Sequence, residues 1–168
     1  MRERDVARLY EDHAQDLFAF LAYRTGDRAL AEDLLADTFE RVLTARRGHD
    51  ARRGSAKTWL YAIALNLLRD HLRRAGAERR ALERTRVPVA AGSDPGADDA
   101  RFAQIDDRDQ IAGALQALPE DEREALALRY GADLGMREIA RLLDEPLTTV
   151  EGRVRRGLRR VRDEVEVT

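Results

Sequence analysis

The residues with the clearest chemical potential are arginines near the end of the chain, in the stretch TTVEGRVRRGLRRVR. Six arginines lie between positions 153 and 162, and no acidic residue interrupts this segment. Helical spacing predicts one narrow apolar stripe beside them, formed by Val150, Val154, Leu158 and Val161. The arginines then cover most of the remaining circumference, where their guanidinium groups suit the phosphates and base edges of nucleic acid.

A short helix and a tight break precede this arginine helix. The segment MREIARLL has apolar residues at helical spacing, and Asp144-Glu145-Pro146 breaks the chain after it. Thr148, with Glu151 three residues later, forms a capping-box pattern that predicts a helix start at Thr148. Two helices joined this closely favour a helix-turn-helix, whose second helix enters the DNA major groove. A solvated arginine face making local ion pairs is the alternative that this segment leaves open.

Composition limits the classes of function. The 168 residues include 30 basic and 32 acidic ones, and the net charge of -2 excludes a globally basic nucleic-acid binder. The chain has no cysteine, and its three histidines are scattered, so we expect no metal, no cofactor and no enzymatic activity. No apolar run reaches membrane-spanning length and the N-terminal segment lacks a signal-peptide core. We therefore expect a soluble, cytoplasmic protein without membrane insertion.

Helical periodicity predicts an all-α fold of two small helical domains, at residues 1–84 and 108–168, joined by a flexible linker at 85–107. The first domain should hold three main helices. One ends near Gly26, the next is capped by Asp27 and has an acidic outer surface, and the third follows the loop GHDARRGSAK. The linker contains VPVAAGSDPGADDA, which is rich in proline, glycine and aspartate and lacks periodicity, as is typical of a tether.

The start of the predicted third helix combines cations with aromatic rings, at Arg52, Arg53, Lys57, Trp59 and Tyr61. In nucleic-acid binding, cations hold phosphates while aromatic rings stack on bases or wedge them apart. A polar face continues along the same helix, formed by Asn66, Arg69, Asp70, Arg73 and Arg74. For Trp59 and Tyr61, a place in the hydrophobic core is the open alternative.

Taken in order, these segments resemble the extracytoplasmic-function (ECF) sigma factors of bacterial RNA polymerase. LYEDHAQDLFAFLAYRTGDRALAEDLLADTFERVL is similar to the start of the family's region 2, and TWLYAIALNLLRDHLRR to its strand-melting segment. ALQALPEDEREALALRY, followed by the helix-turn-helix, is similar to region 4. The resemblance covers nearly everything outside the linker. It implies a non-catalytic specificity subunit that binds core RNA polymerase and promoter DNA.

The resemblance also implies roles for individual residues. In the family the acidic helix of region 2 docks on the clamp helices of the largest polymerase subunit, which implicates Asp33, Asp37, Phe39 and Glu40. Melted minus-10 DNA would be held by Arg52, Arg53, Lys57, Trp59, Tyr61, Asn66, Arg69, Arg73 and Arg74, with the Asn66 amide facing an extruded base. Minus-35 duplex would be bound by Thr148, Thr149, Arg153, Arg155, Arg156 and Arg160. An anti-sigma factor is a further candidate partner, because family members often have one.

The chain departs from the family pattern at Glu151-Gly152, where members often carry a basic or hydroxyl-bearing pair. A carboxylate at Glu151 repels phosphate but can accept a hydrogen bond from a cytosine amino group. Gly152 weakens the helix by about 1 kcal/mol relative to alanine. We therefore expect an unusual minus-35 preference. The alternative function is a helix-turn-helix transcription regulator that acts without replacing a sigma subunit.

Overall fold

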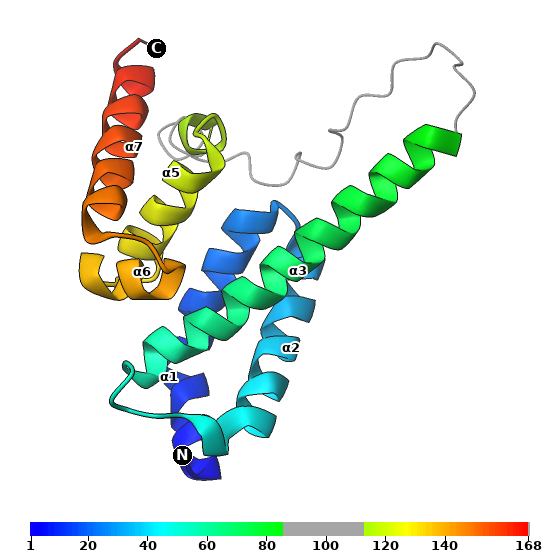
Figure 1. Cartoon of the computed structure of the whole chain (residues 1–168), viewed down its shortest axis with the longest axis vertical. Helices are drawn as coiled ribbons and strands as arrows, with labels where there is room; N and C mark the ends of the chain where they lie inside the picture. Colours follow the sequence, from blue (N-terminus) through cyan, green and yellow to red (C-terminus); the bar gives the residue numbers. More distant parts are fainter. Residues whose placement is uncertain (86–112, 168) are drawn as a thin grey trace.

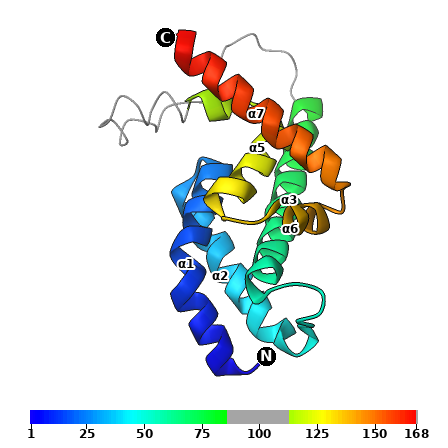
Figure 2. The ribbon, with the colours of Figure 1, turned by 90° about the vertical axis from the view of Figure 1, so that its left-hand side faces the viewer.

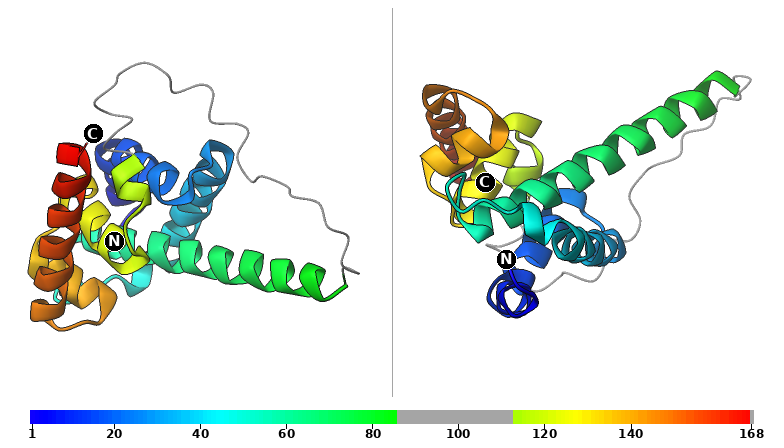
Figure 3. Two further views of the ribbon diagram at one scale, coloured as in Figure 1. Left: turned by 90° about the horizontal axis from the view of Figure 1, so that it is seen from above. Right: turned by 60° about the horizontal axis from the view of Figure 1, so that its bottom comes forward.

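Three long helices form the first half of the protein. In the computed structural model, α1 spans Glu3–Thr25, α2 spans Arg28–Ala45 and α3 spans Ala56–Thr85, with a short 3-10 turn, η1, at Arg46–Gly48 (Figure 1). The structure describes residues 1–85 and 113–167, so almost all of the predicted linker lies outside the described residues. The far end of α3 projects beyond the other helices (Figure 3).

The junction between α1 and α2 follows from two adjacent residues. Gly26 adopts a left-handed conformation with φ of 65°, and its N–H donates to the carbonyl of Ala22 at 2.9 Å. This conformation ends α1, because few residues other than glycine adopt it without strain. Asp27 then accepts a hydrogen bond from the N–H of Leu30 at 3.1 Å and caps α2. Both local predictions are confirmed.

Several short elements and one long helix form the second half. A helical turn at residues 113–116 leads to α5 (Glu120–Leu126), the π-helical η2 (Ala127–Gly131), α6 (Met136–Leu143) and α7 (Leu147–Val167). Asp144, with φ of 55°, ends α6 as the sequence predicted. The predicted start of α7 at Thr148 is one residue late. The carbonyl of Pro146 accepts from the N–H groups of Thr149 and Val150, at 3.0 and 3.2 Å, so the helix already includes Leu147.

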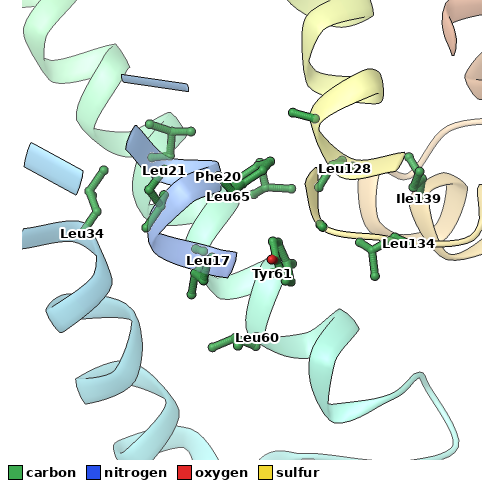
Figure 4. Packing of buried hydrophobic residues seen from close by; sticks show 14 of the residues in the cluster. Leu17, Phe20, Leu21, Leu34, Leu60, Tyr61, Leu65, Leu128, Leu134 and Ile139 are labelled. Atoms are coloured by element: carbon green, nitrogen blue, oxygen red, sulfur yellow. The ribbon is translucent and has the colours of Figure 1, made fainter. Parts of the chain in front are cut away.

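One hydrophobic cluster joins the two halves. Leu17 and Phe20 of α1 and Tyr61 of α3 belong to the same cluster of buried residues as Leu128 of η2 and Ile139 of α6 (Figure 4). Accordingly η2 lies against α1, and α6 lies against α3 (Figure 2). The two predicted helical domains thus share a core in this arrangement. None of the described helices is long and apolar enough to span a bilayer.

The apolar stripe of α7 differs from the predicted one at a single position. Val150 and Val154 are buried as expected, but Leu158 is 44% exposed and Gly157 is buried instead. A Cβ atom at Gly157 would lie 2.9 Å from Cδ1 of Leu126, so α5 approaches the backbone of α7 at this point. After Val154, the next buried position is three residues later rather than four, because an α-helix has 3.6 residues per turn.

This close approach makes Gly157→Val destabilising, by roughly 1–3 kcal/mol of unfolding free energy, because the new methyl groups would overlap Leu126. Gly152→Val is the matched control, since a Cβ there would meet only the flexible end of Arg156. The control should shift the unfolding free energy by less than about 0.5 kcal/mol. Urea unfolding followed by circular dichroism measures both values. Equal losses for the two variants would contradict the packing described for α5 and α7.

Candidate nucleic-acid interfaces

The surface of α3 and of the loop before it carries most of the residues predicted to bind melted DNA. Arg52 and Arg53 are exposed in the loop, and Asn66 is exposed on the helix, with no side-chain hydrogen bond to any described residue. Further along, Arg73 and Arg74 line a shallow hollow of about 310 Å³ together with Asp70 and Ala77. Arg73 forms an ion pair with Asp70, which orients it along the helix. The part of the surface formed by these residues is therefore cationic and exposed.

The two aromatic residues at the start of α3 have different environments. Tyr61 is fully buried and packs edge-to-face on Phe20, with ring centroids 5.4 Å apart. Burial raises the pKa of the Tyr61 hydroxyl well above its ordinary value, so the group stays neutral. In this conformation Tyr61 offers no surface to a base, and we reassign it to the core. Trp59 is only partly buried, with its ring 5.1 Å from that of His49, and can still meet a ligand.

Three residues of α3 are engaged by the second half of the chain. Lys57 donates to the carbonyl of Asp133 at 3.4 Å, and Arg69 donates to the carboxylate of Glu124 at 3.1 Å. The hydroxyl of Thr58 donates to the carboxylate of Glu138 at 2.9 Å. Lys57 and Arg69 are two of the predicted DNA ligands. In this arrangement protein groups occupy part of the surface that DNA would use.

The carboxylate of Glu138 ties α6 to α3. Its second oxygen accepts from the N–H of Gly135 at 2.9 Å, at the start of α6. The hydrogen bond from Gly135, and secondarily the one from Thr58, lowers the pKa of Glu138. A lowered pKa means that the folded state favours the ionised carboxylate. This contact therefore contributes stability above the ordinary pKa of a glutamate and loses it as the pH falls through the lowered value.

A buried arginine forms ion pairs between the halves. The side chain of Arg24, at the end of α1, is only 2% exposed. Its Nη2 donates to Glu120 and lies 3.6 Å from Glu124, and both carboxylates belong to the first turns of α5. Because Glu124 also pairs with Arg69, one carboxylate connects α1 and α3 to α5. We call the four residues Arg24, Arg69, Glu120 and Glu124 the interdomain clasp. No pattern in the sequence predicts the clasp, because its partners lie far apart in the chain.

The predicted docking surface on α2 is acidic and free. Asp33, Asp37 and Glu40 are exposed and form no ion pair with any residue in the described ranges. Phe39 is buried, and its ring packs against Tyr10 of α1 with centroids 4.8 Å apart. Phe39 therefore supports this surface from below, while the exposed ring of Tyr10 adds an apolar element that sequence reasoning missed.

The arginines of α7 fall into two rows. The inner row faces carboxylates of the second half. Arg153, with a side chain only 17% exposed, pairs with Asp121 at 3.1 Å and Glu145 at 3.0 Å, while Arg156 and Arg160 share Glu122. The outer row is exposed and unpaired among the described residues, and consists of Arg155, Arg159 and Arg162. Thr148 is exposed at the start of the helix, and Thr149 is partly buried. Arg159 and Arg162 were not among the predicted DNA-binding residues. Their position away from the apolar stripe of α7 would have identified them as exposed.

The chain matches two family models in series. Residues 9–78 match Sigma-70 region 2, and residues 108–161 match Sigma-70 region 4. It is 33% identical over 144 residues to the ECF RNA polymerase sigma factor SigC of Mycobacterium tuberculosis, covering 85% of this chain and 74% of the relative. It is 27% identical over 139 residues to the ECF sigma factor SigM of Bacillus subtilis, covering 83% and 82%.

Two solved structures share the fold. One is the sigma factor RpoE of Bartonella quintana in complex with the anti-sigma factor NepR, with a TM-score of 0.78, 22% identity and 98% coverage of both chains. The other is CnrH in complex with the cytosolic domain of CnrY, with a TM-score of 0.70, 22% identity and coverage of 99% and 90%. The similarity extends over both halves of this chain.

Charge reversal in the interdomain clasp should separate the two halves. Glu124→Arg would place a third guanidinium beside Arg24 and Arg69, and losing a partner of a buried charge costs on the order of 3 kcal/mol. Because the chain has no cysteine, Ala36→Cys and Val165→Cys introduce unique positions for a fluorescent donor and acceptor. We expect lower energy transfer in Glu124→Arg than in the parent, without loss of helix content.

Glu32→Arg is the matched control, because it makes the same charge change on α2, where Arg28, an exposed neighbour, is the one ion-pair partner of Glu32 within residues 1–85 and 113–167. Energy transfer in this control should equal that of the parent. An unchanged transfer efficiency in Glu124→Arg would show that the clasp does not hold the halves together.

Proposed function

We propose that this chain, which belongs to the extracytoplasmic-function (ECF) sigma factors of the sigma-70 family, holds one promoter at two places while it is bound to core RNA polymerase. It is an RNA polymerase sigma factor, a non-catalytic subunit that directs transcription initiation. The observation that carries this assignment is the ordered match of both regions, with exposed basic surface on α3 of region 2 and on α7 of region 4.

In this proposal region 4 binds the minus-35 element as duplex DNA. The exposed side of α7 enters the major groove and presents Thr148, Arg155 and Arg159. The outer ends of Arg156 and Arg160 join them, since these side chains are 47% and 57% exposed. Arg153 and Thr149 lie closer to the packed side of α7, so we assign them mainly to shaping the helix.

Region 2 holds the melted minus-10 strand in the proposal. Extruding one base costs a few kcal/mol, which a pocket and nearby cations must offset. Asn66 is exposed on α3 and offers both a donor and an acceptor to a base edge. Arg52, Arg53, Arg73 and Arg74 are exposed on the same helix or the loop before it, and can hold the sugar-phosphate backbone. Trp59 supplies a partly exposed ring for stacking.

Core polymerase is the proposed partner of the acidic α2 surface. Asp33, Asp37 and Glu40 are free of ion pairs with the described residues and available to a basic or polar helix pair, such as the clamp helices of the largest subunit. The site of action is then the cytoplasm. An anti-sigma factor is a second candidate partner, because the two structures of similar fold were solved with protein partners, one of them named an anti-sigma factor.

The interdomain clasp implies a second role for core polymerase, which is to separate the two halves. Lys57 and Arg69 have protein partners in the closed arrangement, so these two residues become fully available to melted DNA only when region 4 separates from region 2. We infer that binding to core polymerase separates the halves and sets the distance between them. The free protein would then bind promoters weakly, in agreement with its net charge of -2.

Asn66→Ala tests the role assigned to region 2. The variant should bind core polymerase as tightly as the parent but form open complexes on the order of tenfold less, because an extruded base loses its polar partner. Run-off transcription on a genomic promoter library first identifies a promoter that the parent uses. Permanganate footprinting on that promoter then measures strand opening. Gln15→Ala, which removes an exposed amide on α1, is the control and should open promoters normally.

Two outcomes would contradict the proposed function. Normal permanganate reactivity with Asn66→Ala would remove the base-holding role. Failure of the parent protein to associate with core polymerase, combined with sequence-specific binding to duplex DNA on its own, would favour the helix-turn-helix regulator instead.

A further inference from the structure

The carboxylate of Glu122 is buried between α5 and the arginine helix α7. It belongs to the first turn of α5, its side chain is only 5% exposed, and it faces the arginine helix α7. Its Oε1 accepts a hydrogen bond from Nε of Arg156 at 3.2 Å, and its Oε2 lies 3.0 Å from Nε of Arg160. One buried carboxylate thus accepts a hydrogen bond from Arg156 and forms an ion pair with Arg160, on adjacent turns of one helix.

The geometry of this contact leaves the arginines able to bind a second partner. Both contacts use Nε, on the inner side of each guanidinium, and about half of each arginine side chain remains exposed. A guanidinium held at Nε can still present its two Nη groups to the two acceptors of a guanine edge or to a phosphate. Arg153 differs, because Asp121 and Glu145 occupy two of its nitrogens and leave it mostly buried.

Fixing an arginine matters because the free side chain has many rotamers. An unrestrained arginine loses that freedom when it binds one base, whereas a restrained one has lost it already during folding. A flexible arginine side chain can reach phosphates at several positions, which raises the affinity for DNA of any sequence. Arginines held in one direction contact base edges at one register, which discriminates between sequences.

We propose that Glu122 is a positioning residue for minus-35 recognition, which aims Arg156 and Arg160 at the DNA and thereby sets the sequence discrimination of region 4. This inference rests on the proposed function, because it assumes that α7 binds the minus-35 element. It adds that an acidic residue, which on its own would repel DNA, is required for specific binding. Arg155, Arg159 and Arg162, which lack such a partner, then supply affinity rather than discrimination.

Glu122→Gln is the variant that tests the proposal, because it keeps the shape of the side chain and removes its charge. Holoenzyme is assembled with core polymerase, and its binding is measured on a promoter that the parent transcribes, with the minus-35 element intact or scrambled, over a range of salt concentrations. We expect the ratio of the two affinities to fall on the order of tenfold. Affinity for the scrambled promoter should stay equal or rise, and its salt dependence should steepen by about one unit of log slope.

Glu145→Gln is the matched control, because it removes one carboxylate charge from the same domain but frees Arg153 rather than the two exposed arginines. Its affinity ratio should stay within about twofold of the parent value. If both variants shift the two affinities together and leave the ratio unchanged, Glu122 acts only through its charge and the proposal is wrong.

A double-mutant cycle separates positioning from a loss of folding. In an Arg156→Ala/Arg160→Ala background, Glu122→Gln should leave the affinity ratio unchanged, because the side chains through which it acts are gone. A further fall in the ratio in that background would show that Glu122 acts through the fold of region 4, which overturns the proposal. If the parent holoenzyme shows no preference for the intact minus-35 element, the proposed function of region 4 fails, and this outcome is distinct from the others.

Discussion

The arrangement of the whole molecule depends on how one buried guanidinium is neutralised. Arg24 is almost completely enclosed, and a charged group in such a place must have a charged partner close by. Its partners come from α5, 96 positions further along the chain for Glu120. The apolar cluster around Leu17, Tyr61 and Leu128 supplies attraction between the halves, but hydrophobic contact has little directional preference. The ion pair fixes which side of α5 faces region 2.

Helix α5 distributes its acidic residues between two basic neighbours. Glu120 and Glu124, four residues apart and thus on one side, face Arg24 and Arg69 of region 2. Asp121 and Glu122 lie on another side and face the inner arginines of α7. This explains how a chain with a net charge of -2 presents two basic surfaces. Many of its acidic groups in region 4 are turned toward the protein's own arginines, whereas the outer arginines of α7 form no ion pair with the part of the chain that the structure describes.

Local signals were sufficient to predict the elements, and distant pairings were not. Gly26, Asp27 and Asp144 act on their immediate neighbours, so the ends of α1 and α6 and the cap of α2 followed from the sequence. Tyr61 was misassigned because its neighbours are cationic, whereas its environment is decided by Phe20 on another helix. Leu158 was predicted to be buried at the place where the structure buries Gly157. A stripe of aliphatic residues does not show where a neighbouring helix crosses. The clasp and the role of Glu122 depend on α5 lying between α3 and α7, which no local pattern reveals.

The two sets of acidic residues on α5 also determine which contacts would change if the halves separated. Opening the interdomain clasp would release Arg69 and Lys57 of region 2 from their partners in region 4. Glu124 would lose both of its arginine partners, whereas Glu120 would keep its ion pair with Arg123 of the same helix. It does not touch Asp121 or Glu122, whose contacts lie entirely within region 4. Opening of the clasp would therefore leave these contacts of the α7 arginines in place, as the proposed binding of region 4 to duplex DNA requires. Region 2 is thus the half whose proposed DNA-binding surface would change on separation. On the proposed function, region 4 can bind duplex DNA before the clasp opens, and the strand-holding surface of region 2 becomes complete afterwards.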